Sequence, residues 1–217
     1  MIEQLILVRH GETVHNVAGI AQGWNDSALS ARGEEQVRRL AERLVPLGVD
    51  ALFSSPLERA MSTAHAIAGM TGLEIGVLEE LREMSYGGWE GRSFLEVRHE
   101  DDEIYRRWIV DADAPCPRGE SHNDVRQRLE RAFANIGVSQ EQLRHTGGSN
   151  GGGLANGARR VVVVTHGTAI RVAATALLEL PVMASRHFAQ DNASMNVFAW
   201  RGDRYVLKLW NDTTHCL

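Results

Sequence analysis

Two stretches of the chain, "LILVRHG" at residues 5–11 and "VVVVTHG" at residues 161–167, repeat one pattern: an apolar run that ends in His-Gly. Each run is short, continuous and rich in apolar residues, which is typical of a strand buried on both faces of a parallel sheet. In open α/β sheets, ligands bind beyond the carboxyl ends of the strands. We therefore expect His10 and His166 to lie together at one such edge.

The rest of the chain alternates strand and helix signals. Further strand-like runs occupy residues 49–55, 195–200 and 205–210, and helices are expected at 30–48, 55–72, 93–108, 121–137 and 168–180. Within 55–72, Ser55 is expected to cap the helix, with Pro56 at its first position and Gly72 as its stop. This alternation predicts a three-layer α/β fold, with a mostly parallel β-sheet and helices on both faces.

The domain organisation follows from composition. No linker separates two comparable halves, so residues 1–217 are expected to form a single domain. Within it, a segment at about 90–120 is expected to act as a cap over the site, and residues 145–158 as a flexible Gly-rich loop. That loop lacks the Lys-Ser/Thr ending of a phosphate-binding loop.

Charge and cysteine usage narrow the class of protein. A net charge of −5 and a pI near 6.0 argue against nucleic-acid binding through bulk positive charge. The N-terminus shows no signal-peptide pattern, and the apolar stretch 161–180 carries charged residues, so we expect a cytoplasmic protein without membrane association. Cys116 and Cys216 lack metal-ligand spacing, although a bridge between them stays open at this point.

The position of Arg59 in the sequence indicates an anionic ligand. It falls in the first turn of the helix expected at 55–72, where the helix dipole favours anions and disfavours cations. A bound dianion would relieve that conflict. Together with Arg9, which precedes His10, this position suggests a two-pronged grip on phosphate oxygens.

Five motifs in the expected order, "RHGET", "SSPLERAMSTA", "LREMSYGGWEG", "GES" and "VTHG", resemble the histidine phosphatase superfamily in its phosphoglycerate-mutase-like branch. The resemblance implies that His10 is a nucleophile that becomes phosphorylated and that Glu83 is the proton donor. It also implies that Arg9, Arg59 and His166 belong to the catalytic set and line the phosphate pocket. Further phosphate-binding residues are expected at Asn16, Gln22, Gly23 and Gly167. The residues alone leave Glu12, Glu80 and Glu90 open as alternatives to Glu83.

The chemistry of phosphomonoesters suits these residue types. The attacking group must be uncharged, which neutral imidazole satisfies near pH 7, and a backbone carbonyl accepting from the far ring nitrogen would fix its tautomer. Positive surroundings are expected from the two arginines and from a protonated His166. Thr168 is expected to cap its helix rather than face the pocket, and Trp24 and Trp89 either pack or line the substrate mouth.

These observations predict a metal-independent phosphomonoesterase that acts on small phosphorylated metabolites, with no cofactor and no metal site. A cofactor-dependent phosphoglycerate mutase is the alternative, and a non-catalytic phosphate-binding protein is a third reading. The expected partner is a small-molecule phosphomonoester, and the sequence leaves a homodimer open.

Overall fold

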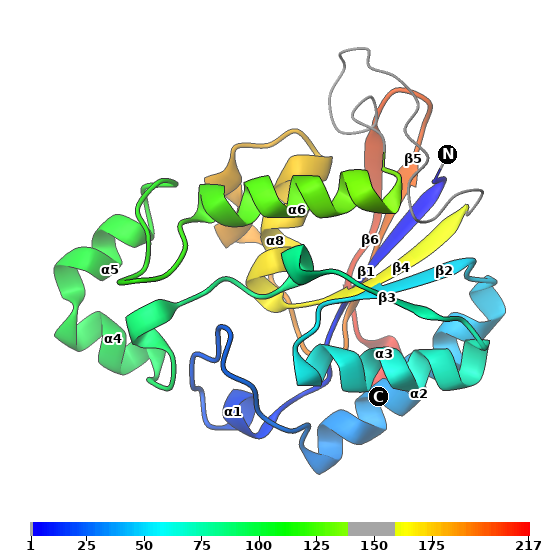
Figure 1. The fold of residues 1–217 in the computed structure, drawn as a ribbon, viewed down its shortest axis with the longest axis horizontal. Helices are drawn as coiled ribbons and strands as arrows, with labels where there is room; N and C mark the ends of the chain where they lie inside the picture. The colour runs from blue at the N-terminus through cyan, green and yellow to red at the C-terminus, as the bar shows by residue number, and fades with distance from the viewer. Residues whose placement is uncertain (1, 139–158) are drawn as a thin grey trace.

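A computed structural model of the chain describes residues 2–138 and 159–217, and these form a six-stranded sheet at the centre of the molecule (Figure 1). The strands lie in the order β3-β2-β4-β1-β5-β6. The four strands β3, β2, β4 and β1 are parallel, whereas β5 runs antiparallel to β1 and β6 antiparallel to β5. Their bounds are β1 Gln4–Arg9, β2 Ala51–Ser54, β3 Ile75–Val77, β4 Arg160–Thr165, β5 Met195–Trp200 and β6 Tyr205–Asp212.

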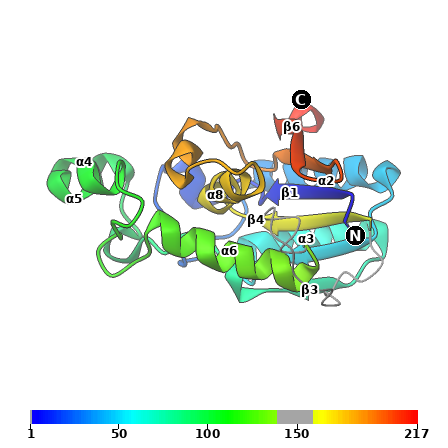
Figure 2. The same ribbon diagram turned by 90° about the horizontal axis from the view of Figure 1, so that it is seen from above.

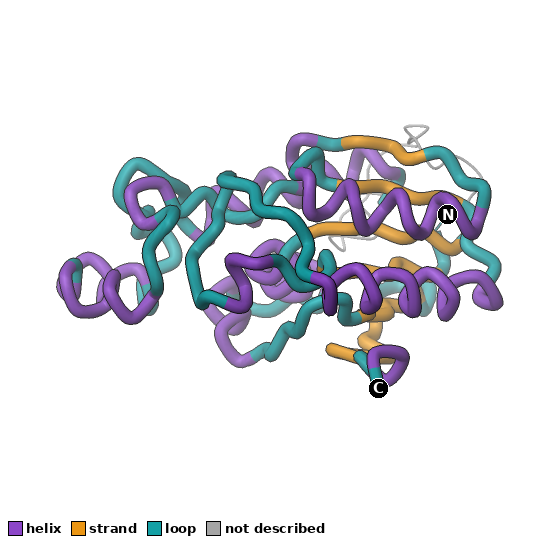
Figure 3. The backbone as a smooth tube through the Cα atoms, turned by 90° about the horizontal axis from the view of Figure 1, so that it is seen from below, coloured by secondary structure: helices purple, strands orange, loops and turns teal. Residues whose placement is uncertain are grey.

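Helices cover both faces of this sheet, which confirms the predicted three-layer α/β fold. Helices α2 (Ala31–Leu44) and α3 (Glu58–Thr71) lie on one face, seen nearest in Figure 3, and α6 (His122–Ile136) and α8 (Gly167–Leu177) lie on the other, seen nearest in Figure 2. The central strands β1 and β4 have apolar interiors because alternate side chains enter different cores. Along β1, Leu5 and Leu7 pack on the α6 and α8 side, whereas Ile6 and Val8 pack on the α2 and α3 side.

Most helix starts follow the expected capping rules. Ser30 accepts a hydrogen bond from the amide of Gly33 at the start of α2, and Ser121 forms a capping box with Asp124 at the start of α6. Helix α2 ends at Leu44, and a 3₁₀ turn then reaches Gly48 at φ 62°. The short α1 (Val14–Val17) precedes these elements.

The start of α3 differs from the prediction. The helix begins at Glu58, and its cap position is Leu57, which provides no side-chain hydrogen bond. The carboxylate of Asp26, far away in sequence, accepts from the amides of Glu58 (2.7 Å) and Arg59 (3.5 Å) instead. Ser55 is therefore not the cap: among the amides at the start of the helix, its hydroxyl accepts only from that of Leu57 (3.3 Å), before the helix begins. The predicted stop at Gly72 is confirmed, since its φ of 72° is left-handed.

Two short helices, α4 (Phe94–Glu100) and α5 (Asp102–Trp108), extend from the end of the sheet at which the parallel strands finish (Figures 1 and 2). The expected single helix at 93–108 is broken at Asp101, whose ψ of 35° departs from helical geometry. The pair is joined to the main body through aromatic packing, with the rings of Trp89 and Trp108 5.4 Å apart. These helices fall within the expected cap segment at 90–120, whose role stays a prediction. The expected loop at 145–158 lies outside the described residues.

Two further features bear on the class of protein. Among the described residues, no helix has both the length and the apolar character needed to span a membrane. Cys116 is buried and Cys216 is partly buried, and both are free thiols.

Candidate active site

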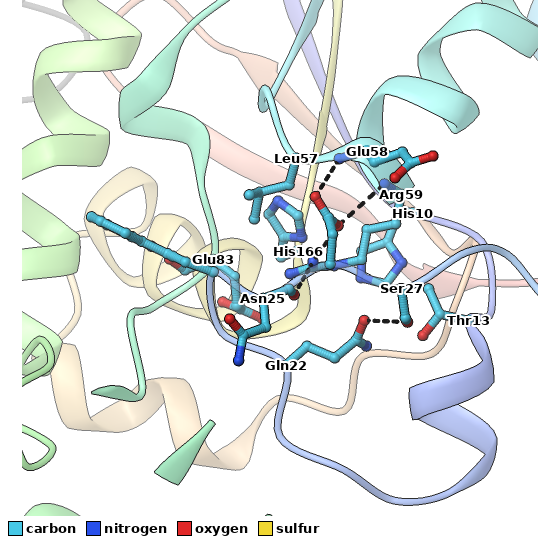
Figure 4. Close-up of polar contacts among 12 residues, drawn as sticks. His10, Thr13, Gln22, Asn25, Ser27, Leu57, Glu58, Arg59, Glu83 and His166 are labelled. Atoms are coloured by element: carbon cyan, nitrogen blue, oxygen red, sulfur yellow. Dashed lines mark hydrogen bonds and ion pairs between the residues drawn. The ribbon is translucent and has the colours of Figure 1, made fainter. Parts of the chain in front are cut away.

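The register of the sheet brings the two histidines together. Arg9 at the end of β1 is paired with Thr165 at the end of β4, so the next residues, His10 and His166, follow side by side at the carboxyl edge. Their ring centroids are 5.2 Å apart with planes at 57°, and both side chains are buried (Figure 4). The expectation that these two imidazoles converge is met.

His10 is held as a neutral imidazole with one nitrogen free to react. Its Nδ1 lies 2.7 Å from the carbonyl oxygen of Gly11, so this nitrogen carries the hydrogen and donates it. No group in the described part of the chain bonds to Nε2, which therefore keeps its lone pair. Burial, followed by the charges of Arg59 and Arg9, lowers the pKa of His10 well below its ordinary value. The ring is uncharged at neutral pH, as the chemistry requires.

His166 is favoured as a neutral ring in the ligand-free site, and its expected protonation around a bound phosphate stays a prediction. Burial lowers its pKa well below the ordinary value, and Arg59 and His10 add to the effect. Its Nε2 lies 2.8 Å from the hydroxyl of Ser55, whereas its Nδ1 is buried without a partner. Sequence reasoning missed Ser55 as this partner. The signal was available, because Ser55 directly follows β2 as His166 follows β4, and the two strands are neighbours.

Arg59 is 1% exposed and ties the 23–26 loop to the start of α3. Its two terminal nitrogens donate to the carbonyls of Gly23 (2.7 Å) and Asn25 (2.9 Å) and to the carboxylate of Asp26 (2.7 Å). Its Nε is buried with no partner. Asp26 is a second residue that sequence reasoning missed, and no local pattern marks a cap supplied from another loop.

Arg9 has a similar arrangement. One terminal nitrogen donates to the carbonyl of Gln190, and its Nε is buried without a partner. Three buried polar atoms around His10 thus lack hydrogen-bond partners within the described residues: the Nε atoms of Arg9 and Arg59 and the Nδ1 of His166. Buried polar groups in folded proteins are nearly always paired, so such a group of atoms marks a place where a polar ligand binds.

The side-chain amides of Asn16 and Gln22, which were predicted to bind phosphate, lie in the segment between β1 and α2. The Oδ1 atom of Asn16 accepts from the amide of Thr13 (3.1 Å) and from Nδ2 of Asn192 (3.0 Å). Gln22 is buried, and its Oε1 accepts from the hydroxyl of Ser27 at 2.9 Å (Figure 4). With both carbonyl oxygens engaged, the amide nitrogens are the groups left to donate. Asn192, which also lies 3.3 Å from the carbonyl of His10, was not foreseen.

The two predicted glycines occupy tight positions. Gly23 has a φ of 55°, and a Cβ there would collide with the side chain of Glu90. A Cβ at Gly167 would lie 3.4 Å from the guanidinium carbon of Arg9, so this glycine lets the start of α8 approach that arginine closely.

Glu83 is the acid that the fold fixes beside this site. Its carboxylate accepts from the amides of Met84 (2.8 Å), Thr168 (3.1 Å) and Ala169 (3.1 Å), the last two in the first turn of α8. Its backbone carbonyl accepts from Arg128 of α6 and from the indole of Trp24, each at 2.8 Å. Glu83 is 8% exposed, so the carboxylate is held at one place near the surface of the site.

The contacts of Thr168 and of the two tryptophans bear on the remaining expectations. Thr168 does not cap α8, because its hydroxyl pairs with the hydroxyl of Tyr86 at 2.7 Å. Trp89 is fully buried and packs in the core, whereas Trp24 is 43% exposed and lies against Glu83. Within residues 2–138 and 159–217, no group of three or more His, Cys, Asp or Glu side chains could hold a metal ion.

Comparison with known proteins defines the class to which this fold and site belong. The sequence profile of the histidine phosphatase superfamily (branch 1) matches residues 5–213. The chain therefore belongs to the histidine phosphatase superfamily.

Particular relatives carry both phosphatase and mutase names. A protein of Enterobacter sp. (strain 638) named "Probable phosphoglycerate mutase GpmB" is 32% identical over 219 residues, covering 98% of this chain and 94% of its own. The structure of a mycobacterial glucosyl-3-phosphoglycerate phosphatase, in complex with VO3, is 31% identical with a TM-score of 0.81, covering 96% of this chain and 98% of its own. A phosphoserine phosphatase of Entamoeba histolytica is 28% identical with a TM-score of 0.80, covering 99% of each chain.

Proposed function

We propose that the protein is a metal-independent phosphomonoesterase that hydrolyses small phosphorylated metabolites through a phosphohistidine on His10. The observation that carries the proposal is the state of the His10 ring. It is neutral, its Nδ1–H is engaged by the Gly11 carbonyl, and its Nε2 has no protein partner. A second imidazole and two guanidinium groups surround it, and three of their nitrogen atoms are buried without partners.

In the first step, the lone pair on Nε2 of His10 attacks phosphorus, and the bond from phosphorus to the ester oxygen breaks. Arg9, Arg59 and His166 hold the three equatorial oxygens, where positioning and electrostatic stabilisation provide most of the acceleration. The amide groups of Asn16 and Gln22 and the approach permitted by Gly23 and Gly167 complete the grip on the phosphate. Glu83 donates its proton to the departing oxygen, so that the product leaves as a neutral alcohol.

In the second step, a water molecule attacks the phosphorus of the phosphohistidine. Glu83, now a carboxylate, takes a proton from that water, and the N–P bond breaks to return the electron pair to Nε2. Inorganic phosphate and neutral His10 are the products, and Glu83 is again protonated. The site needs no further group for this cycle.

Phosphoglycerate mutase is the second candidate, because relatives 32% identical over nearly the whole chain carry that name. A mutase returns the phosphoryl group to a second hydroxyl instead of to water. Hydrolysis is favoured here because three similar solved structures match with TM-scores of 0.80 to 0.81 and are named α-ribazole phosphatase, glucosyl-3-phosphoglycerate phosphatase and phosphoserine phosphatase.

A panel of phosphomonoesters, run with and without a bisphosphoglycerate, separates the two candidates. Each reaction is scored for inorganic phosphate and for the isomerised phosphoglycerate. We expect phosphate release that does not depend on the bisphosphoglycerate. Isomerised product that exceeds released phosphate, and that requires the bisphosphoglycerate, would establish the mutase instead.

A further inference from the structure

A second cavity, which we call the aromatic cavity, lies beside the site, where the α4–α5 segment meets α6 and α8. Its volume is about 370 Å³, within the range of pockets that enclose small organic ligands. It is lined by Tyr86, Phe94, Tyr105, Trp108, Ile109, His122, Thr168, Arg171, Ser185 and Arg186. None of these residues is acidic, and two are arginines.

The aromatic cavity adjoins the site at Thr168, which lines it. The backbone amide of this residue donates to the carboxylate of Glu83, and its hydroxyl pairs with Tyr86 in the cavity wall. Arg171 donates to the same hydroxyl at 2.9 Å. The positive charge of Arg171 also contributes to the lowered pKa of Arg9, so the cavity and the phosphate pocket share one electrostatic environment. Thr168 thus contacts Glu83 through its backbone and the cavity wall through its side chain, so the acid and the cavity are neighbours.

Among the residues that the structure describes, no carboxylate forms an ion pair with the two arginines of the aromatic cavity. Arg186 donates to the backbone carbonyl of Ile109, and the ion pairs formed within residues 2–138 and 159–217 include neither Arg186 nor Arg171. The same two charges, after burial, lower the pKa of His122 to about 4, so this ring is neutral at pH 7. Two guanidinium groups without a carboxylate partner form a site for an anionic group, since their planar donors match carboxylate and phosphate oxygens.

The walls of the aromatic cavity determine what kind of molecular body the anionic group can be attached to. Tyr86 and Phe94 meet edge to face at 5.3 Å, and Trp108 lies 5.0 Å from the ring of His122. Flat or apolar groups pack well against such surfaces. The indole Nε1 of Trp108 and the Nδ1 of His122 are buried with no hydrogen-bond partner, so the walls also hold unused polar atoms.

From these observations, and resting on the proposed function, we infer that the aromatic cavity is the leaving-group subsite and that it selects phosphomonoesters whose alcohol carries a second anionic group on a flat or apolar body. The phosphate binds between the two histidines, the ester oxygen meets Glu83, and the second anion reaches Arg171 and Arg186.

The test compares three synthetic esters that share one body. The first ester, 4-(phosphonooxy)phenylacetate, carries a carboxylate on its methylene group. In the second ester a phosphonate replaces this carboxylate, and in the third, 4-(phosphonooxy)phenylacetamide, an uncharged amide replaces it. The methylene group insulates the phenol, so the three leaving groups differ little in intrinsic reactivity. We expect kcat/KM for at least one anionic ester to exceed that for the amide by about 10–100-fold, as charge-assisted hydrogen bonds provide. The better of the two anions identifies which kind the subsite takes.

Two variants test whether Arg171 and Arg186 cause the preference for anionic esters. Arg171→Gln and Arg186→Gln should each lower kcat/KM for the preferred anionic ester at least tenfold more than for the amide. Arg201→Gln, an exposed arginine in the turn between β5 and β6, is the matched control and should change neither value. Equal kcat/KM for all three esters, or equal losses on anionic and neutral esters in both variants, would overturn the inference while the amide still reports hydrolysis. Absence of phosphate release from every ester would instead refute the proposed function itself.

Discussion

The state of individual side chains at the carboxyl edge of the sheet determines which chemistry the site can perform. His10 is neutral because burial and two guanidinium groups lower its pKa, and the Gly11 carbonyl fixes which nitrogen is free. His166 experiences the same field from Arg59 and is neutral as well. A bound dianion would oppose this field and favour protonation of His166, so the charge of this ring is expected to depend on the ligand.

At the same scale, Glu83→Gln should discriminate between esters by the quality of their leaving group. Without an acid, alkyl phosphates must expel an alkoxide, so kcat/KM should fall by about 10²–10⁴-fold, whereas for 4-nitrophenyl phosphate it should fall by less than about tenfold. Glu80→Gln removes one of the three other acids that the sequence left open and serves as the control, with little change on either ester. Equal losses on both esters in Glu83→Gln would show that Glu83 is not the proton donor.

At the scale of secondary-structure elements, α6 fixes the loop that carries Glu83. Arg128 on this helix is 6% exposed and donates to the backbone carbonyls of Glu80, Arg82 and Glu83 at 2.7–2.8 Å. The same guanidinium forms a two-point pair with the carboxylate of Glu120 at 2.8 and 2.9 Å. One arginine therefore joins two loops to α6 and sets the position of the acid.

Replacement of Arg128 by Gln should be costly, because it removes the cation paired with Glu120, whose carboxylate keeps only the amide of Ser85, and it takes donors from several carbonyls. We expect the free energy of unfolding to fall by about 3–5 kcal/mol, the usual result of breaking a buried ion pair. Arg126→Gln, on the same helix, removes a more exposed pair with Glu130 and should cost less than about 1 kcal/mol. Arg128→Lys should recover only part of the loss, because an ammonium cannot make the two-point contact. Denaturant unfolding measures all three, and similar values for the two Gln variants would contradict this role of Arg128.

The element scale also shows how far the sequence could predict the site. The pairing of His10 with His166 was predictable, because each follows an apolar strand in the same local pattern. The register of the two neighbouring parallel strands then places the two histidines side by side. The cap of α3 was not predictable, because Asp26 accepts from the first helical amides from a separate loop. The nearby Ser55 matched the usual capping pattern and was therefore chosen instead. The preference of His166 for the neutral form in the ligand-free site was not foreseen either, since burial and distant arginines cause it and neither is visible in a motif.

At the scale of the whole molecule, the site assembles from segments that are remote in sequence. Four segments meet at one edge of the sheet: residues 9–16 at the end of β1, the loop before α3, the Glu83 loop and the turn after β4. The α4–α5 segment adds the aromatic cavity beside them.

Four histidines whose rings are favoured as neutral in the folded protein affect how its stability depends on pH. The pKa values of His10, His166, His122 and His215 are all lowered by burial first of all.

A lowered histidine pKa means that the unfolded chain binds protons that the folded chain does not. The free energy of unfolding should therefore fall as the pH drops below the ordinary histidine pKa of about 6.5, and continue to fall until the folded pKa is reached. For His122, whose folded pKa is about 4, the loss between about pH 7 and pH 5 should be about 2 kcal/mol. Urea unfolding of wild type and His122→Gln at both pH values isolates this contribution. The variant should lose about 2 kcal/mol less than wild type over that interval, and an identical loss in both proteins would contradict the assignment.

The most direct measurement of the central claim is to trap the phosphoenzyme. The protein is mixed with an aryl phosphate, quenched in alkali within milliseconds, digested, and analysed by mass spectrometry for a phosphoryl group. We expect the group on the peptide that contains His10, stable in alkali and lost in acid, present in a His65→Asn control and absent in His10→Asn. A protein that releases phosphate steadily from the ester yet never carries a phosphoryl group on His10 under the alkaline quench would contradict the account.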